Sequence, residues 1–172
     1  MRASYAPTRH LHTQFGFRSS SQAQQLYAQS GRRSWSDRVK AMLKGRTRRL
    51  LDLATVLATT TVLDSQYAGL QTVPVSQIRG TSSKGRSQDF DADFNLLNRR
   101  NEARWLNVAA AWQQGKLPPV SLIQVGSVYF VQDGHHRISV IQAAGQEEIE
   151  AEVTILRVAG SLPWEQPASV AA

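Results

Sequence analysis

The second half of the chain contains a hairpin pattern followed at once by a helix pattern, and this order most constrains the fold. The apolar stretches S-L-I-Q-V and V-Y-F-V, within 121–131, flank the tight-turn sequence V-G-S-V at 125–128, which is typical of two antiparallel strands. D-G-H-H-R-I-S-V-I-Q-A-A-G, 133–145, predicts a helix closed by Gly145. A strand with one acidic face follows at 149–156. This alternation predicts a mixed α/β domain.

The first half of the chain adds helices, a strand and a long polar loop. Helical patterns begin at 34 and again after Gly45, and a third covers 98–115. The β-branched stretch 72–78 predicts a strand, and the polar stretch 79–94 predicts a loop long enough to carry function. The predicted buried stripes are Trp35, Val39, Met42 and Leu43 in the first helix, Leu50, Leu53, Ala54 and Leu57 in the second, and Trp105, Val108, Ala109 and Trp112 in the third.

These patterns divide the chain into four segments. We predict a disordered basic arm over 1–20, a basic helical extension over 21–66, a folded domain over 70–158 and a flexible tail over 159–172. A length of 172 residues suffices for one core but not for two large domains. The expected class is α/β of the α+β kind, with a small mixed-sheet domain preceded by a basic helical N-terminal arm.

The net charge of +7 is unevenly distributed. Residues 1–49 hold eleven Arg and Lys against one acid, whereas the remainder holds nine bases and twelve acids, so the two parts carry +10 and −3. A basic arm on a near-neutral body predicts nonspecific contact with DNA or RNA, and a solvated tail is the open alternative. The candidate nucleic-acid residues are Arg32, Arg33, Arg38, Lys40, Lys44, Arg46, Arg48 and Arg49.

The absence of cysteine excludes disulfides, thiolate metal sites and a cysteine nucleophile. The first twenty residues lack the continuous apolar segment of a secretory signal, although their Arg and Ser content also resembles an organellar transit peptide. The apolar stretch 50–63 is too short and too polar to span a bilayer. We therefore expect a cytoplasmic protein without a membrane partner. The sequence does not indicate an oligomeric state.

The D-G-H-H-R turn is the main candidate site. Asp133 is predicted to cap the helix, and Gly134 lets the backbone turn tightly or approach a ligand. The first amides of the helix, those of residues 135–137, lack intrahelical acceptors and attract an anion, to which Arg137 adds a bidentate donor. His135 and His136 are candidate ligand-binding groups, with His135 also a candidate acid or base. In the alternative, Asp133 only caps the helix while the histidines pack.

Residues 72–156 resemble the ParB/sulfiredoxin-like fold, through P-V-S-Q-I, the L-P-P-V hairpin, D-G-H-H-R, the following A-A-G and I-E-A-E-V. This resemblance covers about half the chain. It implies a nucleotide-binding domain whose loop-to-helix turn holds phosphate through the positions of Gly134 and Arg137. We expect the chain to be a bacterial member of this group that carries a D-G-H-H-R motif.

The turn distinguishes between branches of the group. Sulfiredoxins resemble G-C-H-R here, so their essential cysteine would stand at His135, and sulfinic acid reduction by that mechanism is excluded. ParB proteins resemble G-E-R-R and continue into recognition helices after this domain, whereas only a short tail follows Val158 here, so we do not expect site-specific DNA reading of the ParB kind. The ParB-related free serine kinases resemble D-G-H-x-R, which this turn matches most closely.

The loop at 79–94 is the second candidate site. Its pattern G-R-x-x-D-F-D resembles that of ParB-like bacterial proteins. Arg86 is a candidate clamp for an anionic substrate, and Asp89 and Asp91, together with Asp133, are candidate ligands for Mg²⁺ shared with phosphate. The spacing excludes an EF-hand, because Phe94 stands at the required glycine position. An exposed acidic loop without a ligand is the alternative.

Two functions follow as hypotheses. In the first, the turn binds ATP, ADP or CTP with Mg²⁺, and phosphoryl transfer or nucleotide hydrolysis uses Asp133 and His135 as catalytic residues. In the second, the domain is a non-enzymatic, nucleotide-responsive module whose basic arm binds nucleic acid with a steep salt dependence. A third possibility, a ParB-like nuclease, has no metal-nuclease spacing to support it.

Overall fold

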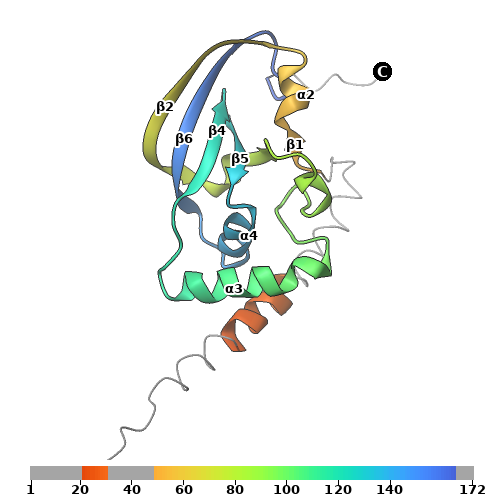
Figure 1. Cartoon of the computed structure of the whole chain (residues 1–172), viewed down its shortest axis with the longest axis vertical. Helices are drawn as coiled ribbons and strands as arrows, with labels where there is room; N and C mark the ends of the chain where they lie inside the picture. Colours follow the sequence, from red (N-terminus) through yellow and green to blue (C-terminus); the bar gives the residue numbers. More distant parts are fainter. Residues whose placement is uncertain (1–20, 31–48, 166–172) are drawn as a thin grey trace, which may run out of the picture.

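The computed structural model describes residues 21–30 and 49–165 and shows a mixed α+β fold built on one six-stranded sheet (Figure 1). The strand order is β1-β3-β5-β4-β6-β2, with both parallel and antiparallel neighbours. The strands are β1 (Leu51–Asp52), β2 (Thr61–Pro74), β3 (Ile78–Thr81), β4 (Val120–Val125), β5 (Val128–Asp133) and β6 (Glu148–Ala159), and the helices are α2 (Leu53–Leu57), α3 (Glu102–Gln113) and α4 (His135–Ala143). Residues 21–30 are also helical.

The predicted hairpin and the helix after it are confirmed. β4 and β5 pair antiparallel across a turn in which Gly126 has a φ of 57°, a left-handed value that favours glycine. Along β5 the side chains alternate between the two faces of the sheet, so that Tyr129 and Val131 join one core and Phe130 joins another. The hairpin therefore supplies the centre of both hydrophobic layers.

One face of the sheet is covered by helices stacked in layers. Ile138 and Ile141 of α4 pack against β4, β5 and β6, and α3 packs on the other side of α4. The indole nitrogen of Trp105 in α3 donates to Ser139 Oγ in α4 at 2.9 Å, so this buried polar pair is satisfied. Segment 21–30 lies against the outer side of α3, where Tyr27 meets the Trp105 ring edge-on (Figure 1).

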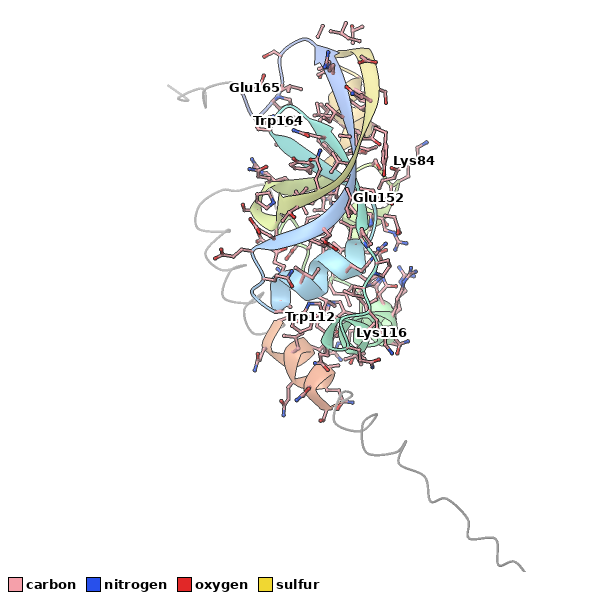
Figure 2. The ribbon with its side chains drawn as sticks, turned by 90° about the vertical axis from the view of Figure 1, so that its left-hand side faces the viewer. Lys84, Trp112, Lys116, Glu152, Trp164 and Glu165 are labelled. Carbon is pink, nitrogen blue, oxygen red and sulfur yellow. The ribbon has the colours of Figure 1, made fainter. Side chains whose placement is uncertain are left out.

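Among the described residues, α2 and the segment after β6 cover one end of the opposite face of the sheet. Leu53 and Val56 of α2 pack there with Phe130, Leu162 and Trp164. Trp164 therefore belongs to a packed segment, which corrects the prediction of a flexible tail for residues up to 165; residues 166–172 lie outside the described residues. Figure 2 shows Trp164 and Trp112 toward opposite ends of the molecule.

The close approach of β3 to β5 depends on a missing side chain. A Cβ added at Gly80 would lie 2.3 Å from the Phe130 ring and 2.8 Å from the carbonyl oxygen of Leu51. No side chain fits at either distance. Gly80 thus lets the Phe130 ring fill the space between β3 and its neighbours.

The first half of the chain differs from the sequence prediction. The helix expected from residue 50 onward is confined to α2, and residues 61–66, predicted to be helical, form the start of the long strand β2. The strand predicted over 72–78 is divided, because Val75–Gln77 form a 3-10 helix before β3 begins. Two register shifts in β2, at Val62/Asp64 and Tyr67/Gly69, break the period-2 alternation that identifies a strand in sequence.

The third helix prediction is largely correct. A 3-10 turn over Arg99–Asn101 leads into α3, which ends two residues before Gly115. Trp105 and Ala109 of the predicted stripe are buried, and Val108 and Trp112 are partly buried against the same cluster. The predicted helix over 34–44 lies outside the described residues. None of the described helices is long and apolar enough to cross a membrane.

Candidate functional site: the turn between β5 and α4

Gly134 forms the turn between β5 and α4 and occupies the N-cap position with a φ of 105°. A Cβ at this position would lie 2.5 Å from Val120 Cγ1, so glycine is required by both conformation and space. The predicted capping role of Asp133 is wrong, because the cap is Gly134 and no side chain bonds the free amides. Asp133 instead ends β5 and points toward Arg137, one helical turn on.

Arg137 is held by its surroundings. Its guanidinium donates to the carbonyl oxygen of Pro118 at 2.9 Å, to that of Pro119, and to the carboxylate of Asp133. The arginine side chain is 14% exposed, whereas that of Asp133 is 70% exposed. The guanidinium is therefore fixed on its protein side by two carbonyls and balanced on its solvent side by a displaceable carboxylate.

His135 is buried under the loop of residues 86–94. Its Nε2 forms a hydrogen bond of 2.8 Å with Thr81 Oγ1, and its ring stacks on Phe90 with centroids 5.8 Å apart. Burial, together with the nearby Arg86, lowers the pKa of His135 to about 4, although the carboxylate of Asp133 opposes the shift. The imidazole is thus neutral at pH 7 and already engaged with the threonine.

The ring of His136 is the part of the site that most clearly lacks hydrogen bonds. Both ring nitrogens are buried, and neither has a hydrogen-bond partner in the described part of the chain. The ring meets Phe90 edge-on at 5.1 Å. Burial lowers its pKa to about 4, with smaller contributions in the same direction from Arg104 and Arg86. The two histidines therefore contribute no positive charge to the site at neutral pH.

The predicted metal ligands in the loop are occupied by the protein itself. Asp89 pairs with Arg86 at 3.1 Å and accepts a hydrogen bond from the side chain of Asn101 at 3.0 Å. Asp91 is buried and accepts from the backbone and side-chain amides of Asn95. Within residues 21–30 and 49–165, no group of three or more His, Asp or Glu residues is arranged to hold a metal ion.

These donors do not fit a preformed magnesium site. A carboxylate that already accepts several hydrogen bonds has fewer lone pairs left for a cation. Asp91 is in that state, and Asp89 is engaged by a cation and an amide. Asp133 alone is well exposed, and it is paired with Arg137. We therefore derive no chemical step through Mg²⁺.

The structure gathers some of the predicted site residues and separates others. Arg86 and Asp89 both influence the protonation of His135 and His136, so the loop and the first turn of α4 form one electrostatic unit. Of the basic arm, Arg49 is described, as an isolated bridge partner of Asp91. The other candidate nucleic-acid residues (Arg32, Arg33, Arg38, Lys40, Lys44, Arg46 and Arg48) lie outside the described residues, and nucleic-acid binding stays a prediction.

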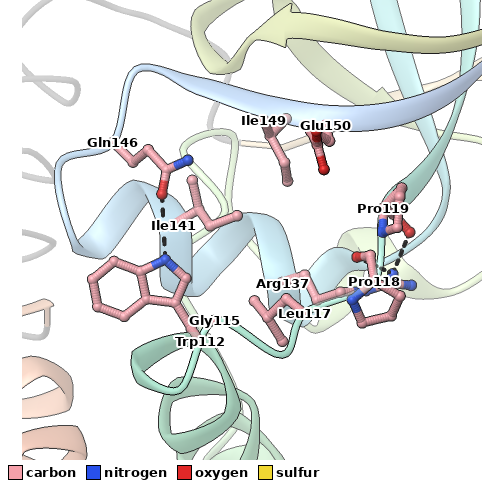
Figure 3. Close-up of a pocket in the computed structure, with 10 residues that line it drawn as sticks. All are labelled: Trp112, Gly115, Leu117, Pro118, Pro119, Arg137, Ile141, Gln146, Ile149 and Glu150. Atoms are coloured by element: carbon pink, nitrogen blue, oxygen red, sulfur yellow. Dashed lines mark hydrogen bonds between the residues drawn. The ribbon is translucent and has the colours of Figure 1, made fainter.

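A cavity of about 280 Å³ lies beside Arg137 (Figure 3). Its lining mixes apolar groups from Trp112, Leu117 and Ile141 with polar residues that include Gln146. The indole nitrogen of Trp112 donates to Gln146 Oε1 at 3.3 Å across one end, as Figure 3 shows. The cavity is near the lower end of the volumes usual for small-molecule sites.

Comparison with known proteins adds one similarity. No protein-family model matches the chain, and no curated protein matches it. Among solved structures, the chain is similar to the crystal structure of sulfiredoxin from Arabidopsis thaliana, with 21% identity and a TM-score of 0.34 over 49% of this chain and 82% of that chain. Sulfiredoxins belong to the fold group that the sequence resembles, but similarity at this level supports no conclusion about the site or the activity.

Several contacts of the site were not predicted from the sequence. Thr81, at the end of β3, holds His135, and the carbonyls of Pro118 and Pro119 hold Arg137. The sequence L-P-P-V gave one usable signal. Each of the two prolines can contribute only a carbonyl acceptor from its backbone, and both carbonyls accept from Arg137.

Proposed function

We propose that the turn at residues 133–137 binds the phosphate of a small ligand, with a nucleotide as the expected class. The observation that supports this most directly is the state of Arg137, whose guanidinium is fixed by two carbonyls yet neutralised only by the exposed carboxylate of Asp133. A phosphate oxygen is a stronger partner for such a fork than a solvated carboxylate. The first amides of α4 lie beside it and add donors.

In the proposed complex, phosphate takes the place of Asp133 against Arg137. Exposed ion pairs are worth roughly 0.2–1 kcal/mol, so exchanging the carboxylate for phosphate opposes binding only weakly. The tight turn at Gly134 brings the helix start close to β4, which leaves the phosphate near the mouth of the cavity. The apolar lining around Trp112 then suits a ring or another apolar part of the ligand.

The proposal is for binding rather than for turnover. His135 is buried and bonded to Thr81, and the described residues contain no group of three or more His, Asp or Glu side chains arranged to hold a metal. Phosphoryl transfer or nucleotide hydrolysis would require the loop around Phe90 to move away from His135. Turnover with Mg²⁺ therefore stays a prediction, and the same ligand panel tests it.

The test is calorimetry with ATP, ADP and CTP, each with and without Mg²⁺, together with thermal shift as a check that ligand stabilises the fold. We expect measurable affinity that falls at least about tenfold in Arg137→Ala. Arg100→Ala is the matched control, since Arg100 is an exposed arginine on the 3-10 turn before α3. Equal affinity in wild type and Arg137→Ala, or no binding of any of the three nucleotides, contradicts the proposal.

Asp133→Asn separates the two possible roles of the carboxylate. If Asp133 competes with phosphate for Arg137, the variant binds nucleotide more tightly, by up to about fivefold for an exposed pair. If Asp133 instead ligates Mg²⁺ as first predicted, the variant binds the magnesium nucleotide more weakly. The direction of the change with Mg²⁺ present decides between them.

A further inference from the structure

The exposed apolar residues of the described chain are concentrated on one strand. Five large hydrophobic side chains are exposed among the described residues, and four of them lie in β2: Val62 at 47%, Leu63 at 66%, Tyr67 at 64% and Leu70 at 59%. In the described structure β2 pairs only with β6 and forms one edge of the sheet (Figure 1). An edge strand with this composition is an attachment site for another strand.

The two bulges of β2 bring its apolar residues to one face. Val62, Tyr67 and Leu70 are separated by odd numbers of residues, so in a regular strand Tyr67 would face away from the other two. Each register shift inserts one residue, and the observed partners on β6 are Val158, Thr154 and Glu152. These partners are separated by even numbers of residues along β6, so they share one face of the sheet, the face opposite α4. The bulges therefore create one apolar row from an irregular sequence.

The same face also carries an acidic row on β6. Glu148, Glu150 and Glu152 are exposed there, next to the apolar row of β2, and Figure 2 labels Glu152 on β6. Stacking two copies face to face would bring these like charges together, which disfavours a sandwich. Pairing at the β2 edge keeps the two acidic rows apart by the width of both β2 strands.

We propose that a second copy of this chain pairs with the β2 edge in antiparallel orientation, so that the two sheets form one continuous sheet about a two-fold axis. The composition of β2 is compatible with pairing to a second β2 strand. It contains one charged residue, Asp64, and any symmetric register centred on another residue keeps the two Asp64 side chains from facing each other. In that arrangement the apolar row of each copy lies directly beside that of its partner, and the open edge of each β2 acquires hydrogen-bond partners.

The length and thickness of the β2 edge limit the contact area of the dimer, and therefore its strength. About ten paired residues span roughly 33 Å, and an edge contact is only one sheet thick, about 10 Å. The contact is then smaller than the roughly 800 Å² per partner of a standard interface. The dimer is therefore a reversible one that depends on protein concentration, not an obligate one.

The first test is the oligomeric state of the full chain, measured by sedimentation over a range of concentrations. We expect a monomer–dimer equilibrium whose dissociation constant rises at least about tenfold in Tyr67→Lys and in Leu70→Lys, because each places a charge in the merged apolar row. Leu97→Lys is the matched control, since Leu97 is 45% exposed but lies outside β2, and it keeps the wild-type constant. A wild type that stays monomeric, or a dimer that Tyr67→Lys leaves intact, overturns the proposal.

The second test uses the lack of cysteine in the chain. Single variants Asp64→Cys, Ser65→Cys, Gln66→Cys and Tyr67→Cys place one thiol at successive positions of exposed backbone, where folding tolerates the change. At a two-fold axis a residue faces its own copy with Cα atoms about 5 Å apart, which a disulfide can bridge. Under mild oxidation we expect disulfide-linked dimers at one or two adjacent positions only. Equal linking at all four positions overturns the proposal, and linking at none overturns a register with its axis at 64–67.

Discussion

Replacing His136 with phenylalanine should remove a large part of the acid sensitivity of this fold. The imidazole is buried without a hydrogen-bond partner in the described part of the chain, and its pKa is lowered to about 4 from an ordinary value of 6.5. The unfolded chain therefore binds a proton more readily than the folded chain does. The stability that depends on the neutral ring is fully present above about pH 6.5 and is lost as the pH falls toward 4.

The magnitude follows from the two pKa values. Between about pH 7.5 and about pH 5, a shift from 6.5 to about 4 corresponds to a loss of about 2 kcal/mol in the free energy of unfolding. Screening by solvent reduces this, so we expect a loss of roughly 1–2 kcal/mol from His136. His135, whose pKa is lowered to the same value, adds a loss of similar size.

The assay is urea unfolding at the two pH values, followed by tryptophan fluorescence. Phenylalanine preserves the ring contact with Phe90 and removes both unsatisfied nitrogens, and any overpacking shifts the stability equally at both pH values. The readout is therefore the difference between the free energies of unfolding at the two pH values. We expect this difference to be roughly half as large in His136→Phe as in the wild type.

Two results would refute this reasoning. The first is an unchanged pH difference in His136→Phe. The second is an acid effect that disappears when His10 and His12, the other two histidines of the chain, are replaced by glutamine. In that case the sensitivity would not belong to the pair at the start of α4.

Two further substitutions test the packing around the site by urea unfolding. Gly134→Ala combines a φ of 105° with a Cβ 2.5 Å from Val120 Cγ1, and we expect a loss of roughly 2–4 kcal/mol. Gly145→Ala, with a φ of 75° and open space, should lose only about 1 kcal/mol, and equal losses would show that the contact is irrelevant. Ser139→Ala removes the acceptor of the Trp105 indole and should cost about 1–3 kcal/mol, whereas a neutral result would mean that this hydrogen bond contributes nothing.

The sequence was most informative where the local pattern and the tertiary environment agree. The β4–β5 hairpin, α3, α4 and β6 follow from periodicity and from the glycines that end the turns and helices. The strand β2 was missed because its two bulges conceal the alternation, and the loop after β3 read as polar although Phe90 and Phe94 lie in the core. In both places the long-range packing, which no local pattern records, decides the structure.

The candidate site, too, was predictable from the sequence only in part. Gly134 and Arg137 were predicted from residue chemistry, and both have geometric roles that fit that chemistry. The role of Asp133 as a cap was wrong, because the space beside Val120 requires the glycine at the cap position itself. The histidines looked like the most reactive residues of the turn, and the structure buries both. Burial of this kind depends on the loop that folds over them, which lies forty residues earlier.

The position of β6 has a consequence for synthesis of the protein. β6 is the last strand to be made, yet it lies inside the sheet between β4 and β2. Pro74 pairs with Glu148, so at ordinary translation rates β2 waits on the order of ten seconds for its partner. During that interval the nascent chain exposes two open strand borders, that of β4 and that of β2. A pause in translation shortly before residue 148 would lengthen this exposure, and chaperones would meet the chain at that stage.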